Sequence, residues 1–516
     1  EQKQAQFLFK IIQYIERQVV LIDALEDAAY EKIHRTEESN KLRQLTERVV
    51  SEGQQEQLKN ILASFGARVI LTAHPTQFYP GTVLAIITDL TDAIQANDIG
   101  LARSLLQQLG NTPFFQKEKP SPLDEAGQLS WYLGNVFYPA IGDVLDYLND
   151  YQKDREATQD QLLSIGFWPG GDRDGNPFVT TTITRQVAEK LRARIVECYH
   201  KEVRELKRRL SFVGVASEIE AIEKQLYNEL THERGDCFSN PEALIQDLNS
   251  IQQTLEKDFQ GLFVDRLISF KRKITAFGFH FASLDIRQDS RVLKSTLDNI
   301  VSSNSELLPS HFPTLAESEQ IQALLGILSG IDANKLNETI ARDTIDSLRT
   351  IREIQESNGE RACNRYIISN CREPLDIARL IALFQLSGWS LDNLTVDIVP
   401  LFETIDDLKS AGANMEVLYS VPEYRAHLER RGNKQTVMLG FSDGTKDGGY
   451  LMANWAIYSA KESLTKVSRS HNIEVCFFDG RGGPPARGGG STYKFYAALG
   501  KNIESNQIDY YQIYLL

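Results

Sequence analysis

Short apolar runs, each followed by a helical pattern, constrain the fold of this chain more than any other feature. Five such runs follow residue 275 and end in polar residues: Phe279–Leu284, Tyr366–Ile368, Val396–Phe402, Val437–Phe441 and Ile473–Phe477. An earlier run, Val69–Leu71, adds a sixth. Nearly continuous apolar strands that alternate with helices are typical of a parallel sheet covered on both faces.

The alternation predicts an α/β fold with a very high helix content. We expect a TIM-like β/α barrel with a large helical insertion, left incomplete because about six of its eight strands are visible. The expected parts are amino-terminal helices in residues 1–66, the first strand and the insertion in residues 67–277, and the other βα units in residues 278–516. The chain starts at Glu1 and ends on the apolar residues Tyr514–Leu516, so we expect a fragment at both ends.

Two apolar stripes predict long helices before the strand-rich part. In the first helix, apolar residues recur at spacings of three and four: Ile12, Ile15, Val19, Ile22 and Leu25. The clearest stripe lies within the insertion: Val187, Leu191, Ile195, Tyr199, Val203, Leu206 and Leu210. Residues at this spacing share one helix face. In addition, Pro122–Glu125 has the composition of a helix start.

A loop rich in glycine and arginine, Gly480–Gly490, follows the last apolar run. Glycine lets backbone N–H groups approach an anion closely, and the guanidinium forks of Arg481 and Arg487 suit phosphate or carboxylate. The loop lacks the lysine of a P-loop and the spacing of a dinucleotide fingerprint. RNA-binding tracts of this composition are long, repeated and basic. The remaining alternatives are an anion site and an ordinary surface loop.

Composition narrows the classes of partner. The net charge of −14 argues against non-specific binding to nucleic acid or to anionic membranes. No apolar run reaches the length of a membrane span, and no signal peptide opens the chain. The five cysteines show no Cys-x-x-Cys spacing, so we expect reduced thiols and a cytoplasmic location.

The ends of the expected strands carry the residues with chemical potential. They are His74, Arg287, Glu403, Asp443 with Lys446, and Arg481 with Arg487. Two carboxylates on neighbouring strands can hold Mg²⁺ or Mn²⁺. Separated arginines can bracket a phosphate, and a histidine and a lysine can move protons or stabilise charge.

Each of these residues also has a structural interpretation. His74 can hydrogen-bond within a turn, and Glu403 or Asp443 can cap the helix that follows. Arg287 can pair with Asp285 or Asp289. The coincidence of all of them at strand ends favours a site.

The motif Phe167–Pro177 is dense in glycine and aspartate. Its Asp-x-Asp-Gly-Asn core hints at a calcium loop, but Pro177 occupies the EF-hand glycine position and Ile183 the position of the final glutamate. Two interpretations remain open. The motif forms a rigid turn between helices, or it brings Trp168 and Arg173 to a pocket.

The motifs together resemble phosphoenolpyruvate carboxylase, in the order of that family and over nearly the whole chain. They are Thr72–Thr76, Gly170–Pro177, Leu284–Gln288, Phe402–Thr404, Phe441–Asp447 and Gly480–Gly490. The resemblance implies a Mg²⁺- or Mn²⁺-dependent lyase that converts phosphoenolpyruvate and bicarbonate into oxaloacetate and phosphate, and so feeds the tricarboxylic acid cycle. It implies attack of bicarbonate on phosphorus, followed by capture of the released carbon dioxide by the enolate of pyruvate.

The resemblance also implies a role for each matching residue. The implied catalytic residues are His74, Lys446 and Arg481. Glu403 and Asp443 are the implied metal ligands. The implied substrate-binding residues are Arg287 and Arg481 at the phosphate, Trp168 near the bicarbonate path, and Arg487 on a loop linked to feedback inhibition.

Two departures from the family pattern matter. Asp479 stands where many members have histidine, which leaves its part in bicarbonate handling in doubt. The family also continues beyond Leu516, where we expect a third phosphate-binding arginine and most of the allosteric inhibitor site. Full-length members are typically homotetramers.

Two alternative functions were weighed. One is another phosphoenolpyruvate-handling barrel enzyme, such as a phosphotransferase relative, which would need a phosphorylatable histidine and a nucleotide domain. The other is a truncated, inactive subunit that acts only in assembly or regulation.

Overall fold

The computed structural model describes residues 2–34, 41–72, 81–113, 120–152, 162–231, 235–328, 330–331, 336, 339–480, 495–496 and 498–512. Residues 1–60 and 74–120 form one compact unit, and residues 61–73 and 121–516 form a second.

The first unit is helical. Its elements include α1 (Gln2–His34), α2 (Lys41–Ser51), α4 (Gly81–Gln95) and α5 (Ile99–Asn111). Helices α1, α4 and α5 share a core that includes Val20, Ala24 and Leu90. The predicted first helix is therefore confirmed, but its apolar stripe is not the buried face, because Ile12, Ile15, Val19, Ile22 and Leu25 are each 45–55% exposed.

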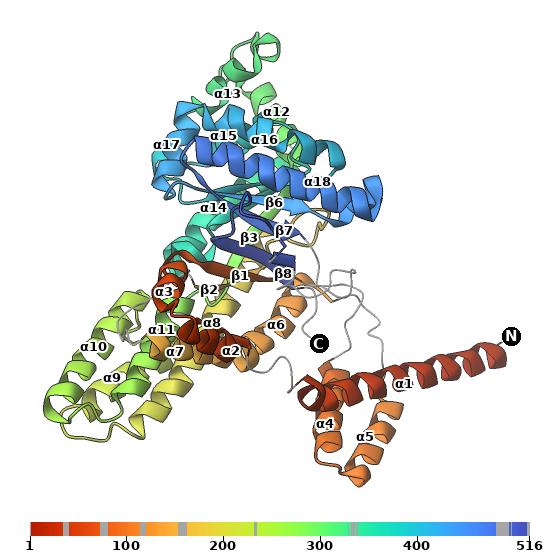
Figure 1. Ribbon diagram of the computed structural model, residues 1–516. Coiled ribbons are helices and arrows are strands. Elements are labelled where there is room, and N and C mark those ends of the chain that lie inside the picture. The colour runs from red at the N-terminus through yellow and green to blue at the C-terminus, as the bar shows by residue number, and fades with distance from the viewer. Residues whose placement is uncertain are drawn as a thin grey trace. The chain divides into compact units, whose positions relative to one another are not determined.

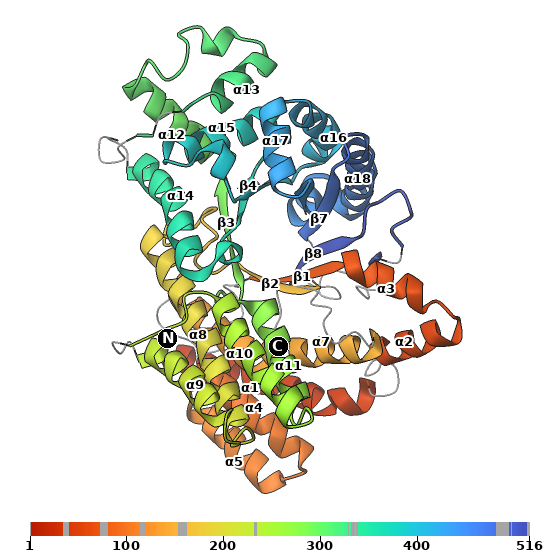
Figure 2. The same ribbon diagram turned by 90° about the vertical axis from the view of Figure 1, so that its left-hand side faces the viewer.

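The second unit is built on a closed barrel of eight parallel strands (Figures 1 and 2). In chain order they are β1 (Gly66–Leu71), β2 (Leu163–Phe167), β3 (Ser283–Asp289), β4 (Arg365–Ser369), β5 (Asp397–Phe402), β6 (Lys434–Gly440), β7 (Glu474–Gly480) and β8 (Gln507–Gln512). Each strand pairs with its neighbours in sequence, and β8 pairs with β1. The prediction of an incomplete barrel with about six strands is therefore wrong.

The two strands that the sequence did not reveal, β2 and β8, lack a continuous apolar run. Gly166 interrupts β2, and a Cβ at this position would lie 2.7 Å from Cγ1 of Ile70 on β1. The close packing of β2 against β1 therefore requires glycine at position 166, where an apolar strand pattern would have a large side chain. In β8, the side chain of Asp509 is fully buried and paired with Arg365 on β4. A buried polar side chain removes the apolar signal on which strand prediction depends.

The barrel interior has an apolar layer and a charged layer. The apolar layer contains Ile70, Trp168, Ile367, Val399, Leu401, Met438 and Phe478. The charged layer joins Arg68 to Asp285 at 2.7 Å and Arg365 to Asp509. Each of these carboxylates is fully buried, so its partner compensates for the cost of removing the charge from water.

Helices surround the barrel. Before β1 and around β2 lie α3 (Gln55–Ser64), α6 (Pro122–Tyr132), the π-helical turn Leu133–Phe137 and α7 (Tyr138–Gln152). The segment between β2 and β3 forms α8 (Thr181–Lys207), α9 (Ala216–Thr231), α10 (Pro241–Asp258) and α11 (Val264–Phe277), which lie together in both views (Figures 1 and 2). Later βα units supply α12 (Ser290–Ser303), α13 (Glu317–Leu325), α14 (Thr339–Asn358), α15 (Pro374–Leu386), α16 (Ile405–Tyr419), α17 (Pro422–Arg430) and α18 (Ser442–Ser470).

Two local predictions in the insertion are confirmed. The stripe from Val187 to Leu210 is buried along α8 and just beyond it. Helix α6 starts where the sequence indicated, with Pro122 in its first turn and a capping box between Ser121 and Asp124.

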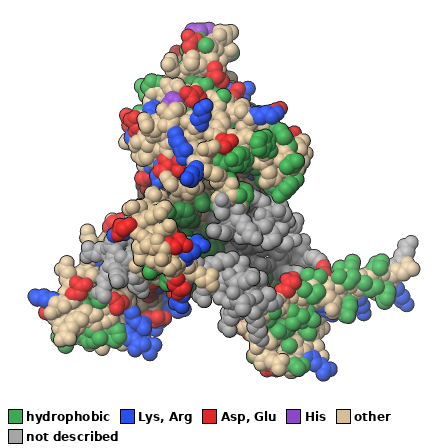
Figure 3. Space-filling model, viewed as in Figure 1, with side chains coloured by type: hydrophobic (Ala, Val, Ile, Leu, Met, Phe, Trp, Pro, Cys, Tyr) green, Lys and Arg blue, Asp and Glu red, His purple; other side chains and the backbone are tan. Residues whose placement is uncertain are grey.

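The cysteines, the helices and the exposed hydrophobic side chains can be compared with the expectations from composition. The five cysteines are free, as expected, and Cys237 alone among them is exposed. In the described part of the chain, no helix has both the length and the apolar composition needed to cross a bilayer. Hydrophobic side chains gather on the exposed end of α18 (Figure 3), where Tyr450, Leu451 and Trp455 are at least half exposed.

We predict that Asp509→Ala lowers the free energy of unfolding by about 3–5 kcal/mol, because it leaves the buried Arg365 guanidinium without its partner. Denaturant unfolding measures this change. The matched control is Glu474→Gln, which removes a half-exposed partner 3.7 Å from Lys434 and should cost less than about 1 kcal/mol. Equal losses in the two variants would contradict a closing role for β8.

Candidate active site

The turn after β2 extends the barrel wall beyond the strand. Backbone N–H groups of Gly171 and Asp172 donate to the Trp168 carbonyl at 2.8 and 2.9 Å. The Arg287 N–H donates to Gly171, and the Arg173 N–H donates back to Arg287, at 3.1 and 2.9 Å. These bonds fasten the turn to β3. The motif is therefore a fixed turn, but it lies between β2 and α8 and not between two helices as predicted.

Glycine is required at two positions in this turn. Gly170 has φ of +82°, and a Cβ there would lie 2.6 Å from Cγ2 of Val187 on α8. At Gly171 a Cβ would lie 2.3 Å from the backbone oxygen of Asp285. The turn can therefore pack against both α8 and β3 only with glycine at these positions.

Arg287, near the carboxyl end of β3, pairs with the turn rather than with its own strand. Its Nε and Nη2 donate to the two carboxylate oxygens of Asp172 at 2.7 and 2.8 Å, and Asp174 lies 3.7 Å from Nη2. Burial lowers the pKa of Arg287, but the charges of Asp172, Asp174 and Glu403 outweigh this and hold the pKa above its ordinary value. The guanidinium is thus permanently charged and held in one plane.

The structural alternative for Arg287, a pair with Asp285 or Asp289, is wrong. Asp285 accepts hydrogen bonds from Arg68 at 2.7 Å and from Nε1 of Trp168 at 3.1 Å. Asp289 instead binds the side chain of Arg291.

Trp168 is part of the barrel interior and also supports Arg287. Its side chain belongs to the apolar layer and is 7% exposed. The Arg287 guanidinium lies over its ring, 4.7 Å from the centroid. A cation on an aromatic face is stabilised by the charge distribution of the ring. Arg173, the other side chain considered for a pocket, is buried and paired with Asp343 instead.

Glu403 follows β5 in an environment that disfavours its negative charge. Burial and the negative charges of Asp443 and Asp174 raise its pKa to about 7, although Arg287 acts in the opposite direction. Glu403 does not cap α16, since Thr404 and Asp407 form the capping box there. Gly440, at the end of β6, permits its close approach, because a Cβ there would lie 3.2 Å from the Glu403 Cα.

Asp443 and Lys446 lie in the first turn of α18 and pair with each other at 2.7 Å. Both are exposed, so this pair is not fixed by burial. Nearby, Asp447 accepts a hydrogen bond from the Ile405 N–H at 3.0 Å, which joins the starts of α18 and α16. This contact holds the element that carries Asp443 next to the element that follows Glu403.

The structure brings several of the predicted site residues together. Arg287 lies over the ring of Trp168, and Asp443 forms an ion pair with Lys446. The charges of Arg287 and Asp443 both shift the pKa of Glu403. His74, Arg481 and Arg487 lie outside the described residues. The sequence did not assign a role to Asp172 or Asp174. Their Asp-x-Asp spacing at a strand end, first considered as a calcium motif, was the available signal.

Among the described side chains, no three His, Cys, Asp or Glu residues converge into a group that could hold a metal ion by themselves. The carboxylates of Glu403 and Asp443 are hard oxygen donors of the kind that Mg²⁺ and Mn²⁺ prefer. Glu403 and Asp443 would thus provide two oxygen ligands, and the described residues do not supply a third.

We predict that Gly171→Ala destabilises the fold by about 1–3 kcal/mol, because the new methyl group meets the Asp285 backbone, which cannot move aside as a flexible side chain can. Thermal unfolding measures the change. The control is Gly81→Ala at the start of α4, where a Cβ meets nothing within 4 Å and no loss is expected. A neutral Gly171→Ala variant would show that the turn is not held against β3.

Comparison with known proteins agrees with the geometry. The family described as Phosphoenolpyruvate carboxylase matches residues 5–233 and 214–502. A phosphoenolpyruvate carboxylase of Nitrosomonas eutropha is 31% identical, over 90% of this chain and 56% of the relative. The corresponding proteins of Nitrosomonas europaea and Aliivibrio salmonicida are each 30% identical, over 90% and 82% of this chain.

The chain spans little more than half the length of these relatives, 56%, 56% and 52% respectively. The family match nevertheless covers most of the sequence, including the turn after β2 and the strand ends that carry Arg287, Glu403 and Asp443. The chain therefore belongs to the phosphoenolpyruvate carboxylase family.

Proposed function

We propose that this chain supplies the barrel and much of the active site of an enzyme that carboxylates phosphoenolpyruvate with bicarbonate, giving oxaloacetate and phosphate. The observation that carries the proposal is that Arg287, a fixed cation, and the carboxyl groups of Glu403 and Asp443 interact electrostatically at the carboxyl end of the barrel. Active sites of β/α barrels lie at this end. The relatives named above carry the same activity in their names.

Arg287 is suited to hold the phosphate of the substrate. Asp172 accepts from Nε and Nη2, and we assign the two Nη1 hydrogens of the planar fork to the ligand. Asp172 and the Trp168 ring fix the plane of the guanidinium before the substrate arrives. Preorganised donors of this kind lower the cost of binding and of stabilising charge.

Glu403 and Asp443 would hold a divalent metal ion, Mg²⁺ or Mn²⁺. The raised pKa of Glu403 comes first from burial and then from the charges of Asp443 and Asp174, and a bound cation would favour the ionised form of this carboxyl. When bound, the metal ion supplies positive charge to an oxygen that becomes negative during the reaction. Lys446, paired with Asp443, would bring a further cation close to this region.

The remaining roles follow from the family motifs. His74 would assist the breakdown of carboxyphosphate, which releases carbon dioxide. Arg481 would bind the phosphate and stabilise its charge during transfer. Arg487 would lie on a loop linked to feedback inhibition. Trp168 would act from below Arg287, since its ring is buried in the barrel.

The wider setting is proposed on the same basis. We expect an allosteric homotetramer of the cytoplasm whose product feeds the tricarboxylic acid cycle. The alternative of an inactive subunit rested on the truncated span of the chain, and it is not favoured, because the matching relatives are named phosphoenolpyruvate carboxylase. The phosphotransferase alternative is not favoured, because the family match covers both the insertion and the barrel.

A coupled assay of oxaloacetate formation tests the proposed reaction. With the protein at its full encoded length, product should require phosphoenolpyruvate, bicarbonate and Mg²⁺ or Mn²⁺ together. Arg481→Ala should lower turnover of phosphoenolpyruvate sharply while the thermal unfolding temperature stays unchanged. Absence of activity with either metal would refute the proposed reaction.

We predict that Glu403→Gln weakens Mn²⁺ binding by at least about tenfold, because the amide keeps the size of the side chain and loses its charge. Calorimetric titration with Mn²⁺ alone measures this independently of turnover. The control is Glu423→Gln, an exposed position at the start of α17 that should leave Mn²⁺ affinity unchanged. Equal affinities in the two variants would exclude Glu403 as a ligand.

A further inference from the structure

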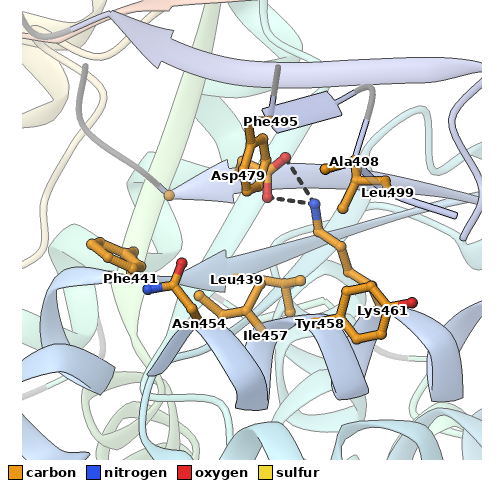
Figure 4. Close-up of a pocket in the computed structure, with 11 residues that line it drawn as sticks. Leu439, Phe441, Asn454, Ile457, Tyr458, Lys461, Asp479, Phe495, Ala498 and Leu499 are labelled. Atoms are coloured by element: carbon orange, nitrogen blue, oxygen red, sulfur yellow. Dashed lines mark hydrogen bonds and ion pairs between the residues drawn. The ribbon is translucent and has the colours of Figure 1, made fainter. Parts of the chain in front are cut away.

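A buried ion pair between Lys461 and Asp479 joins α18 to the end of β7. Nζ of Lys461 lies 2.7 Å from Oδ1 and 3.0 Å from Oδ2 of Asp479. Lys461 is 1% exposed and Asp479 is 4% exposed. Figure 4 shows the lysine reaching from α18 to both carboxylate oxygens of the strand residue.

The surroundings of this pair are apolar and aromatic. The ammonium lies 5.3 to 5.9 Å from the ring centroids of Phe477, Phe495 and Tyr496. The Tyr496 hydroxyl donates to Oδ2 of Asp479 at 2.8 Å. A cavity of about 200 Å³ beside the pair is lined mainly by apolar side chains, among them Leu439, Ile457 and Leu499 (Figure 4).

Such an environment makes the two residues dependent on each other. Either charge alone would be buried in a medium of low polarity, at a cost that exceeds what the pair gains. The hydrogen bond from Tyr496 further requires an acceptor at position 479. Residues 461 and 479 must therefore be matched as donor and acceptor.

The pair also connects two elements of the proposed active site. Helix α18 begins with Asp443 and Lys446, and it is interrupted at Gly449, where φ is 79° and ψ is 168°. Lys461 lies beyond this interruption, on the part of the helix that contacts β7. Asp479 comes two residues before Arg481 in the sequence. The residue between them, Gly480, packs closely on β6, because a Cβ at this position would lie 2.7 Å from the backbone oxygen of Leu439.

We propose that Lys461 is a positioning residue. By holding the Asp479 carboxylate against α18, it fixes the direction in which the chain leaves β7 at Gly480, the last described residue before the segment that contains Arg481. Asp479 is accordingly a fixed partner of Lys461, and neither group takes part in proton transfer. A histidine at position 479 fits Lys461 poorly, because a neutral imidazole brings no negative charge to balance the buried ammonium. It fits better when residue 461 is a neutral glutamine, which leaves no buried ammonium to balance.

The test compares Lys461→Gln, Asp479→His and the double variant in the protein at its full encoded length. We expect each single variant to lower the thermal unfolding temperature by several degrees, and the double variant to recover most of the loss. The control is Arg469→Gln on the same helix, which removes a half-exposed pair with Glu504 and should change little. A double variant no more stable than the worse single variant would refute the matching of the two positions.

The positioning role needs a measurement that stability alone does not decide. Lys461→Gln, assayed below its unfolding temperature, should lower kcat/KM for phosphoenolpyruvate by about 10- to 100-fold, as expected when a binding group is misplaced. Asp479→His with Lys461→Gln should restore it to within about threefold of the wild type, a loss smaller than that of the single variant. A folded Lys461→Gln variant with wild-type kcat/KM would overturn the positioning role and leave a purely structural pair.

This activity measurement rests on the proposed function, so a second one is independent of it. Hydrogen exchange in Lys461→Gln should rise in peptides covering the end of β7 and residues 495–496, while peptides from α16 stay unchanged. If the wild type is inactive, the proposed reaction fails, and the exchange pattern still decides the positioning role. Unchanged exchange at the end of β7 would refute it.

Discussion

Charge that is buried in this barrel has to be paired, and this requirement organises the second unit. Arg68 meets Asp285, Arg365 meets Asp509, and Lys461 meets Asp479, all with side chains at most 10% exposed. The first two pairs join strands that are distant in sequence, and the third joins β7 to the helix that precedes it. A buried charge left alone would cost far more than one exposed on the surface, so these pairs hold the fold in one arrangement.

Paired charges also connect the barrel interior to the candidate active site. Asp285 accepts from Arg68 and from the indole of Trp168, and the indole supports the Arg287 guanidinium. Arg287 in turn binds Asp172 with two hydrogen bonds. Among the described acids at the end of the barrel, Glu403 has a pKa raised to about 7 by burial and by the charges of Asp443 and Asp174. A bound cation would favour its ionised form, which agrees with our proposal that a metal ion binds there.

How much of this was visible in the sequence depended on the kind of signal. Six strands were apparent because their apolar runs are continuous, and the residues at their ends were correctly expected to include Arg287, Glu403 and Asp443 at the carboxyl face. Strands β2 and β8 were not apparent, because neither has a continuous apolar run. In β2, Gly166 allows close packing on the neighbouring strand, and in β8 the buried Asp509 forms an ion pair. Such substitutions are meaningful only once the facing strand is known.

Pairing partners were the least predictable feature, since distance along the chain says little about them. Arg287 has acids two residues away on either side, yet it binds Asp172, which is 115 residues earlier. Asp479 was recognisable from sequence only as a departure from the histidine that many relatives carry. Its partner Lys461 lies on the preceding helix, 18 residues earlier. Because the ammonium and the carboxylate are buried together, the chemistry available at position 479 depends on α18 as well as on β7.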